Sequence, residues 1–181
     1  MFSTLLTVLL LIAVAVLVFL AYVAMKPSDF RIERTAEIKA APEAIFPLIN
    51  DYRNFNRWNP FGFGDTKAVI NYSGANSGDG AAYDWNSTGR AGAGNMRITT
   101  STPPSRIAMK LEFTRPFAAK NDVEFKLIPT GKATSVTWAM SGQRNFSHKV
   151  MGTLFNMDKM VGGEFAKGLA TLKAMAEQPA A

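Results

Sequence analysis

The chain has 181 residues, a formal net charge of +6, a single histidine and no cysteine. Without cysteine it can hold neither a disulfide framework nor a thiolate metal site, and its lone His148 cannot build a His-based metal site or a Ser-His-Asp triad. The basic residues are scattered among acidic and apolar ones. Net positive charge alone is weak evidence for nucleic-acid binding, and we expect none.

The first 25 residues are the most apolar part of the chain. Phe2 to Met25 carry no charge, and at about 1.5 Å per residue they would reach roughly 36 Å, enough to cross the hydrocarbon core of a bilayer. A cleaved signal peptide is a poorer explanation, because no basic residue precedes the run, the run is too long, and Ala21 to Met25 is a poor cleavage site. We predict an uncleaved transmembrane anchor at residues 1–26.

Basic residues follow this apolar run at Lys26, Arg31 and Arg34. The positive-inside rule then places the rest of this single-pass protein in the cytoplasm. The remaining length suits one domain, which we place at residues 29–177, followed by a short tail at 178–181.

A strand and two short helices are predicted next. Residues 30–38 alternate between apolar and polar side chains, which is typical of a strand. Residues 40–49 suit a helix with Pro42 in its first turn, and Asp51 suits the N-cap of a second helix at 52–57.

Six further strands and one long helix complete the predicted elements. The strand-like runs have seven to nine residues and lie at 66–73, 80–88, 94–102, 106–114, 120–128 and 135–141. Short turns separate most of them, so the sheet should be antiparallel. Apolar residues at steps of three and four predict one amphipathic helix from His148 to Glu177, in which Gly162 and Gly163 allow a bend or the close approach of a neighbour.

Alternation places large, soft side chains on one face of these strands. The predicted inward residues are Tyr83, Trp85, Met96, Ile98, Ile107, Met109, Leu111, Phe113, Val123, Phe125, Leu127, Val136, Trp138 and Met140. Their neighbours Asp84, Arg97 and Glu112 should face solvent. Such an apolar face can fill itself or surround an apolar ligand, and methionine suits either use.

The order of elements and several motifs resemble a known family. The motifs are APEAIFPLINDYRNFNRWNP after the first strand, YSGANSGDGAAYDW, GAGNMRIT, LEFTRPF followed by VEFKLIP, and VTWAMSG before the last helix. Together they resemble the START-like helix-grip superfamily, in particular bacterial polyketide cyclase/dehydrase-like SRPBCC proteins. The resemblance implies an α+β helix-grip fold, with a seven-stranded curved antiparallel sheet around a long C-terminal helix and an apolar cavity between them. The predicted N-terminal transmembrane helix would be added to this fold.

The aromatic loop FNRWNPFG, residues 55–62, allows two interpretations. The resemblance implies that it lies near the cavity entrance, with Trp58 and Phe61 as lid or rim residues. Alternatively, Trp58 anchors the short helices onto the sheet, and Asn59 and Pro60 simply end a helix.

No catalytic residue is predicted. The stretch from Gly89 to Gly94 lies between two strands and lacks a Gly-Lys-Ser/Thr ending, so it is a hairpin turn rather than a phosphate loop. Tyr83 either hydrogen-bonds a ligand or has a satisfied hydroxyl in a filled core. Arg144 either meets a ligand head group at a rim or is solvated, and His148 is a surface or capping residue. The family's cyclases share no motif that can be matched here residue by residue.

We therefore predict a membrane-anchored protein that binds a hydrophobic or amphipathic, lipid-like small molecule in an apolar cavity, without metal or cofactor. The predicted ligand-binding residues are Trp58, Phe61, Tyr83, Trp85, Met96, Met109, Phe113, Trp138, Met140 and Phe165. One alternative is a cyclase/dehydrase- or hydrolase-type enzyme, which needs an ionisable group inside the cavity. The other is a protein-interaction or stress-response module, which would have a filled core and an apolar patch outside.

Overall fold

The computed structural model describes residues 2–61, 68–89 and 92–178. Its elements, in chain order, are α1 (Phe2–Met25), β1 (Asp29–Ile38), α2 (Pro42–Asn50), α3 (Tyr52–Phe55), β2 (Val69–Ser73), β3 (Ala82–Asn86), β4 (Ala93–Thr102), β5 (Arg106–Arg115), β6 (Ala119–Thr130), β7 (Ala133–Gln143), α4 (Phe146–Leu154) and α5 (Met157–Ala176). These elements form two compact units. One contains Met1–Phe30 and Gln143–Met157, and the other contains Arg31–Gly142 and Asp158–Ala181.

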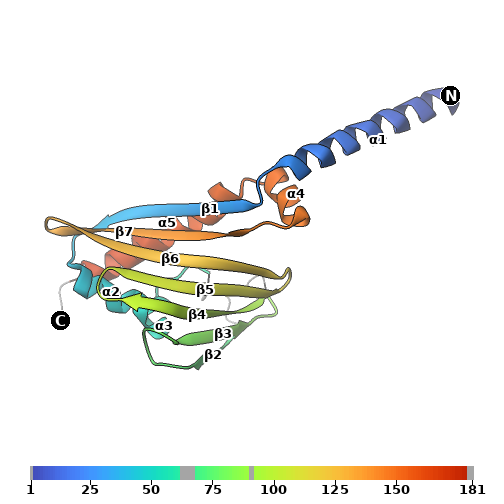
Figure 1. Cartoon of the computed structure of the whole chain (residues 1–181). Helices are drawn as coiled ribbons and strands as arrows, with labels where there is room; N and C mark the ends of the chain where they lie inside the picture. The colour runs from blue at the N-terminus through green and yellow to red at the C-terminus, as the bar shows by residue number, and fades with distance from the viewer. Residues whose placement is uncertain (1, 62–67, 90–91, 179–181) are drawn as a thin grey trace. The chain divides into compact units, whose positions relative to one another are not determined.

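The strands form one seven-stranded sheet in the order β1-β7-β6-β5-β4-β3-β2 (Figure 1). From β2 to β7 each strand pairs antiparallel with the next, as short turns dictate. β1 joins the far edge beside β7, where the hydroxyls of Thr35 and Thr137 lie 2.9 Å apart. The predicted α+β class and seven-stranded antiparallel sheet are confirmed. The predicted start of β2, at residues 66 and 67, lies outside the described residues.

The predicted alternation along the strands is also confirmed. Tyr83 pairs with Met96, and Met96 pairs in turn with Leu111, so the inward positions stand side by side across the sheet. Asp84, which follows Tyr83, and Arg97, which follows Met96, are exposed on the opposite face. This is the period-two geometry of a pleated strand with one face buried.

The C-terminal segment differs from its prediction. A single helix was expected from residue 148 to 177, but α4 ends at Leu154, and α5 begins at Met157. The backbone of Phe155, which follows α4, is extended (φ −122°, ψ 137°). The helical spacing of apolar residues continues through both helices, so the sequence pattern did not reveal this break. The two helices differ in burial: no side chain of α4 is buried, whereas Phe165 and Leu169 of α5 pack in the core. Apolar residues with the same helical spacing therefore belong to two separate helices, and only those of α5 pack in the core.

Gly162 serves the close approach of a neighbour rather than a bend, since α5 continues through it. A Cβ atom at this position would overlap the guanidinium group of Arg34 on β1. Arg34 donates to the Asp158 carboxylate at 2.9 and 3.1 Å and to the Asp158 carbonyl at 3.0 Å. These hydrogen bonds hold the pKa of Asp158 below its usual value and tie β1 to the first turn of α5.

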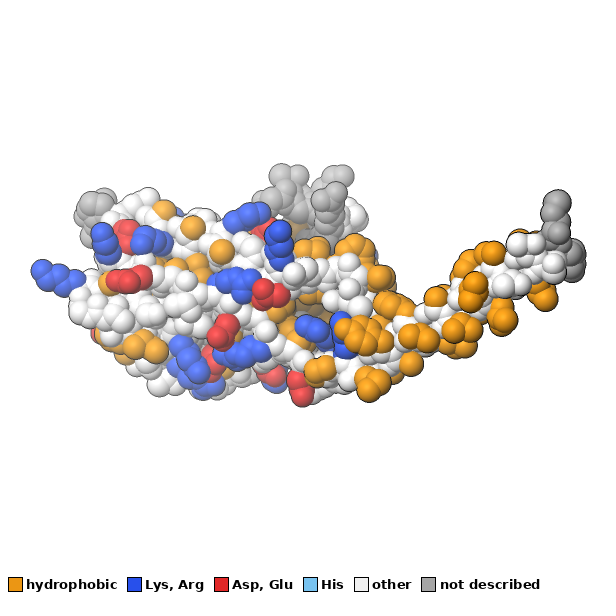
Figure 2. Space-filling model, turned by 90° about the horizontal axis from the view of Figure 1, so that it is seen from above, with side chains coloured by type: hydrophobic (Ala, Val, Ile, Leu, Met, Phe, Trp, Pro, Cys, Tyr) orange, Lys and Arg blue, Asp and Glu red, His pale blue; other side chains and the backbone are white. Residues whose placement is uncertain are grey.

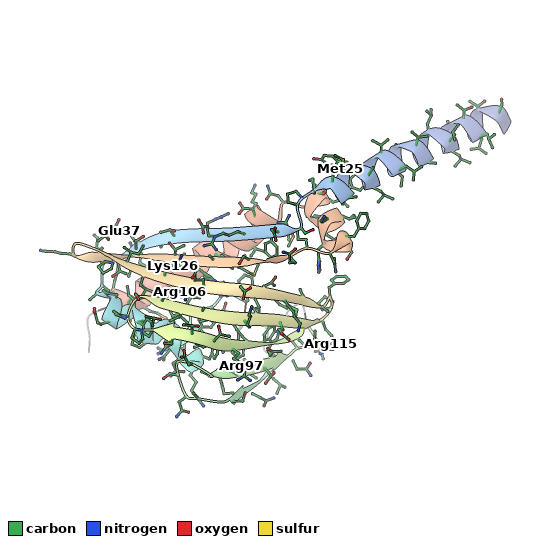
Figure 3. All side chains as sticks on the ribbon, viewed as in Figure 1. Met25, Glu37, Arg97, Arg106, Arg115 and Lys126 are labelled. Atoms are coloured by element: carbon green, nitrogen blue, oxygen red, sulfur yellow. The ribbon has the colours of Figure 1, made fainter. Side chains whose placement is uncertain are left out.

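The outer face of the sheet carries paired charges (Figure 3). Arg106 on β5 and Lys126 on β6 are opposite each other in the ladder, and both approach the Glu124 carboxylate, at 2.7 and 3.4 Å. Lys120 pairs in the same way with Glu112 across these strands, at 3.2 Å. Basic and acidic side chains thus form cross-strand pairs on this face of the sheet.

α1 is the one described helix that is long and apolar enough to cross a membrane, over Ser3–Met25, with a mean hydropathy of 3.1. Figure 2 shows apolar side chains along its length. Leu5, Leu10 and Leu17 are among its exposed residues, each with more than half of its surface accessible. In water such a surface would be costly, so α1 is suited to an apolar environment.

Candidate functional site

A buried aromatic cluster lies between the sheet and α5. The rings of Trp138 on β7 and Phe165 on α5 stack at 4.2 Å, with an interplanar angle of 10°. Phe125, Phe55 and Trp58 surround Trp138, at ring distances of 5.1, 6.3 and 5.6 Å. Because all five side chains are buried, this part of the inward face is packed as a core.

Trp58 belongs to this core. Its ring is 3% exposed, and its indole N–H donates to the carbonyl oxygen of Leu48 in α2 at 2.8 Å. It lies edge-on to Phe55 of α3 and to Phe125 of the sheet. Of the two interpretations of the loop, these contacts match the one in which Trp58 anchors the short helices onto the sheet.

Phe61 differs from Trp58, although only two residues separate them. It is 46% exposed, and its ring meets Trp138 and Phe165 edge-to-face at 6.2 and 6.0 Å. Phe61 thus stands at the surface of the aromatic cluster, at a position suited to a rim. Gly62, the last residue of the quoted loop, lies outside the described residues.

A glycine on α5 makes room for the loop that contains Pro60. A Cβ atom at Gly168 would lie 2.8 Å from both Pro60 Cδ and Trp138 Cζ3, closer than real Cβ contacts allow. Only glycine therefore lets α5, the loop and the tryptophan meet at this point.

On the inward face of the sheet, side chains near the turns that join β3 to β4 and β5 to β6 are more exposed than those of the aromatic cluster. Trp85, Leu111, Phe113 and Met140 all face inward, but each is only half-buried. Trp85 lies edge-on to Phe113 with ring centroids 5.6 Å apart. We call these four side chains the half-open row.

Gly94 makes room for this arrangement. It is paired with both Trp85 and Phe113 in the ladder, and a Cβ atom there would lie 2.5 Å from the Trp85 ring and would also overlap the Glu112 carbonyl oxygen. Because Gly94 has no side chain, the indole of Trp85 extends across β4 toward Phe113.

Tyrosines connect the half-open row to α3. Tyr83 lies 5.7 Å from Trp85 and 4.8 Å from Tyr52, measured between ring centroids. Tyr83 is buried, and its hydroxyl donates to the Met96 sulfur at 3.8 Å. Of the two roles considered for Tyr83, this contact matches a core residue with a partnered hydroxyl.

Sequence reasoning missed Tyr52. Its side chain is 2% exposed, and its hydroxyl has no hydrogen-bond partner among the described residues. The same holds for the side-chain oxygen of Asn56, one turn later, and for the indole nitrogen of Trp138. The spacing of Tyr52, Phe55 and Asn56 on one side of a short helix was the available signal, but it does not show which side chain lacks a partner.

Burial raises the pKa of Tyr52 and of Tyr83 well above the usual value, because a phenolate would lose its hydration. For Tyr52 the charge of a Tyr83 phenolate adds to this effect, and for Tyr83 that of Tyr72 does so. Both hydroxyls therefore remain neutral hydrogen-bonding groups in a largely apolar environment.

The charged candidates lie elsewhere. Asp84 and Arg97 are exposed on the outer face, and Arg97 is labelled in Figure 3. Glu112 pairs with Lys120. His148 lies in the first turn of α4, where its backbone N–H donates to Asn145 at 2.9 Å. Within residues 2–61, 68–89 and 92–178, no three histidine or carboxylate side chains are grouped to hold a metal ion.

Solved structures share this fold at low sequence identity. Protein CV1439 from Chromobacterium violaceum is 14% identical, with a TM-score of 0.59, over 85% of this chain and 100% of its own. The Aha1 dimer from Colwellia psychrerythraea is 16% identical, with a TM-score of 0.58, over 82% and 96%. The di-domain ARO/CYC protein BexL from the BE-7585A biosynthetic pathway is 11% identical, with a TM-score of 0.61, over 87% of this chain and 53% of its own. No curated protein sequence matches the chain.

A family model supplies the assignment that these distant structures cannot. The model described as polyketide cyclase/dehydrase and lipid transport matches residues 29–177, which include all seven strands and the helices α2 to α5. The chain therefore belongs to the polyketide cyclase/dehydrase and lipid transport family, and its fold is the helix-grip fold of that family.

Proposed function

We propose that this protein binds a hydrophobic or amphipathic, lipid-like small molecule against the half-open row. The observation that carries the proposal is that Trp85, Leu111, Phe113 and Met140 face inward yet keep part of their surface accessible. Covering apolar surface yields about 25 cal/mol per Å², so an apolar ligand would gain affinity there. The family description, which includes lipid transport, supports this ligand class.

An amphipathic ligand is favoured over a pure hydrocarbon. The hydroxyl of Tyr52 and the side-chain oxygen of Asn56 are buried without a partner among the described residues. An unsatisfied buried polar group costs about 1–3 kcal/mol, which a polar ligand group within reach would offset. The Tyr52 ring contacts the Tyr83 ring, and the Tyr83 ring contacts the Trp85 ring, so Tyr52 is linked to the half-open row through Tyr83.

Binding rather than catalysis is supported by the position of the ionisable side chains. No Asp, Glu, Lys or Arg within residues 2–61, 68–89 and 92–178 is fully buried. The groups nearest the site that could exchange a proton, Tyr52 and Tyr83, have raised pKa values and are poor bases near neutral pH.

Ligand binding can be tested with 9,10-dibromostearic acid, because bromine quenches a contacting indole. The full chain in lipid nanodiscs should lose tryptophan fluorescence on titration, and Trp85→Phe should remove most of that loss, since Trp58 and Trp138 are buried. Phe113→Ala should weaken binding about 10-fold or more, because it removes a large apolar contact. Phe117→Ala is the matched control, since Phe117 lies exposed between β5 and β6. Unchanged fluorescence would instead favour a protein-interaction module.

We also infer that α1 anchors the protein in a membrane, with the domain on the cytoplasmic side. Support comes from the length and apolar surface of Ser3–Met25 and from Lys26, which follows it. The full chain should stay in the membrane pellet after alkaline carbonate washing. Leu10→Arg combined with Val14→Arg should release it, because each arginine at mid-membrane costs about 2.5–3.5 kcal/mol. Leu10→Ile with Val14→Leu is the matched control and should stay bound; release of the unaltered chain would contradict the anchor.

A further inference from the structure

A second apolar surface lies on α4, in the same compact unit as α1. No side chain of α4 is buried. Phe146, Met151, Leu154 and the following Phe155 are 48%, 46%, 61% and 50% exposed. Phe146, Val150 and Leu154 are four residues apart and therefore lie on one side of the helix. We call these five residues the α4 apolar face.

α4 lies beside the C-terminal end of α1 (Figure 1; Met25 is labelled in Figure 3). The Lys149 ammonium is 3.5 Å from the carbonyl oxygen of Ala24, in the last turn of α1. The backbone N–H of Arg144, just before α4, donates to the carbonyl of Ser28 at 2.8 Å. The α4 apolar face thus begins where the apolar run of α1 ends, which is the level at which the proposed anchor leaves the hydrocarbon.

Basic side chains flank this surface. Lys26, Arg144 and Lys149 lie in this unit, and Asp29 is the only acidic residue among its described residues. Asp29 accepts a hydrogen bond from the side chain of Gln143. A short helix with an exposed apolar face and flanking cations has the composition of helices that lie in the interface of anionic membranes.

We propose that the α4 apolar face lies in the boundary between head groups and acyl chains of an anionic membrane, beside α1. The inference rests on the proposed anchoring through α1. Continuity with the predicted span and the basic flank favour lipid over protein as the occupant of this face. Residues 143–157 then have their own attachment to the bilayer, so the chain is held there at two points rather than by one flexible tether.

The absence of cysteine allows a direct test. Single cysteines at Leu154→Cys and, as an independent second site, Met151→Cys are labelled with the environment-sensitive dye NBD in the full chain. Lys120→Cys is the solvent control, since the Lys120 side chain is 81% exposed, and Leu10→Cys reports on α1. The labelled chains are reconstituted in vesicles of phosphatidylcholine with one-quarter phosphatidylglycerol, or of phosphatidylcholine alone, with brominated lipids or aqueous iodide as quenchers.

We expect labels at 154 and 151 to be quenched several-fold more by brominated lipid than the label at 120, and less by iodide, with a larger effect in the anionic vesicles. Strong iodide quenching at both α4 positions would overturn the proposal. Protection from both quenchers would also overturn it and indicate a protein cover, such as a second copy. Equal quenching in the two vesicle types would overturn the assignment to an anionic surface. If the label at residue 10 is not reached by brominated lipid, the anchor itself is wrong; if it is reached and the α4 labels are not, only this inference fails.

Discussion

Phe165→Ala should lower the free energy of unfolding by about 3–5 kcal/mol, the cost of removing a fully enclosed phenylalanine. Phe165 is 2% exposed, stacks on Trp138 at 4.2 Å and meets Phe61 at its edge. Its loss would leave a cavity beneath Trp138, which neighbouring rings cannot fill without leaving their own contacts. Urea unfolding of the full chain in micelles, followed by tryptophan fluorescence, measures the change.

Lys167→Ala is the matched control on the same helix. The Lys167 side chain is 71% exposed and pairs only with Glu164 in the described structure, so its replacement should change the unfolding free energy by less than about 0.5 kcal/mol. If Phe165→Ala also cost less than about 1 kcal/mol, Phe165 would border a poorly filled space. Its predicted role as a ligand-binding residue would then outweigh its role in the core.

Above pH 10 the protein should lose stability steeply because of Tyr52 and Tyr83. Burial raises both pKa values above the ordinary value of 10.0, so the unfolded chain releases two protons that the folded chain keeps. The stability is fully present below pH 10 and is lost as pH rises from there toward the raised pKa values. Each tyrosine contributes a slope of about 1.4 kcal/mol per pH unit, or roughly 2.7 kcal/mol per unit for the pair.

Tyr52→Phe and Tyr83→Phe should each remove about half of this slope. Lysines titrate in the same range, so the comparison between variants, rather than the total slope, isolates the tyrosines. At neutral pH, Tyr52→Phe should cost little, because the Tyr52 hydroxyl has no partner among the described residues, whereas Tyr83→Phe loses its contact with Met96. Urea unfolding at pH 8 to 11.5 provides the measurement, and equal slopes in all variants would contradict the prediction.

Residue alternation by itself determined the strands and their inward face. Tyr83 and Asp84, or Met96 and Arg97, point to opposite faces whatever the rest of the chain does, because successive side chains of a strand always alternate. The order of strands and short turns then left an antiparallel sheet with one apolar face and an apolar helix stripe to cover it. α1 was equally clear from local composition, since an uncharged apolar run of its length needs no tertiary context to be recognised.

Only the tertiary structure decided which of these apolar residues remain accessible. Trp138 is buried, whereas Trp85 and Phe113, which were predicted to face inward from the same strand alternation, are half-buried. The difference depends on contacts between residues far apart in sequence, which periodicity does not encode.

The same reason explains the other details that local pattern did not reveal. Trp58 is held by the carbonyl of Leu48, and the break after α4 follows from packing that α5 has and α4 lacks. The unpartnered hydroxyl of Tyr52 depends on every group around it. A periodic pattern shows which way a side chain points, but the neighbours brought there by the fold determine whether it is covered, partnered or left open to a ligand.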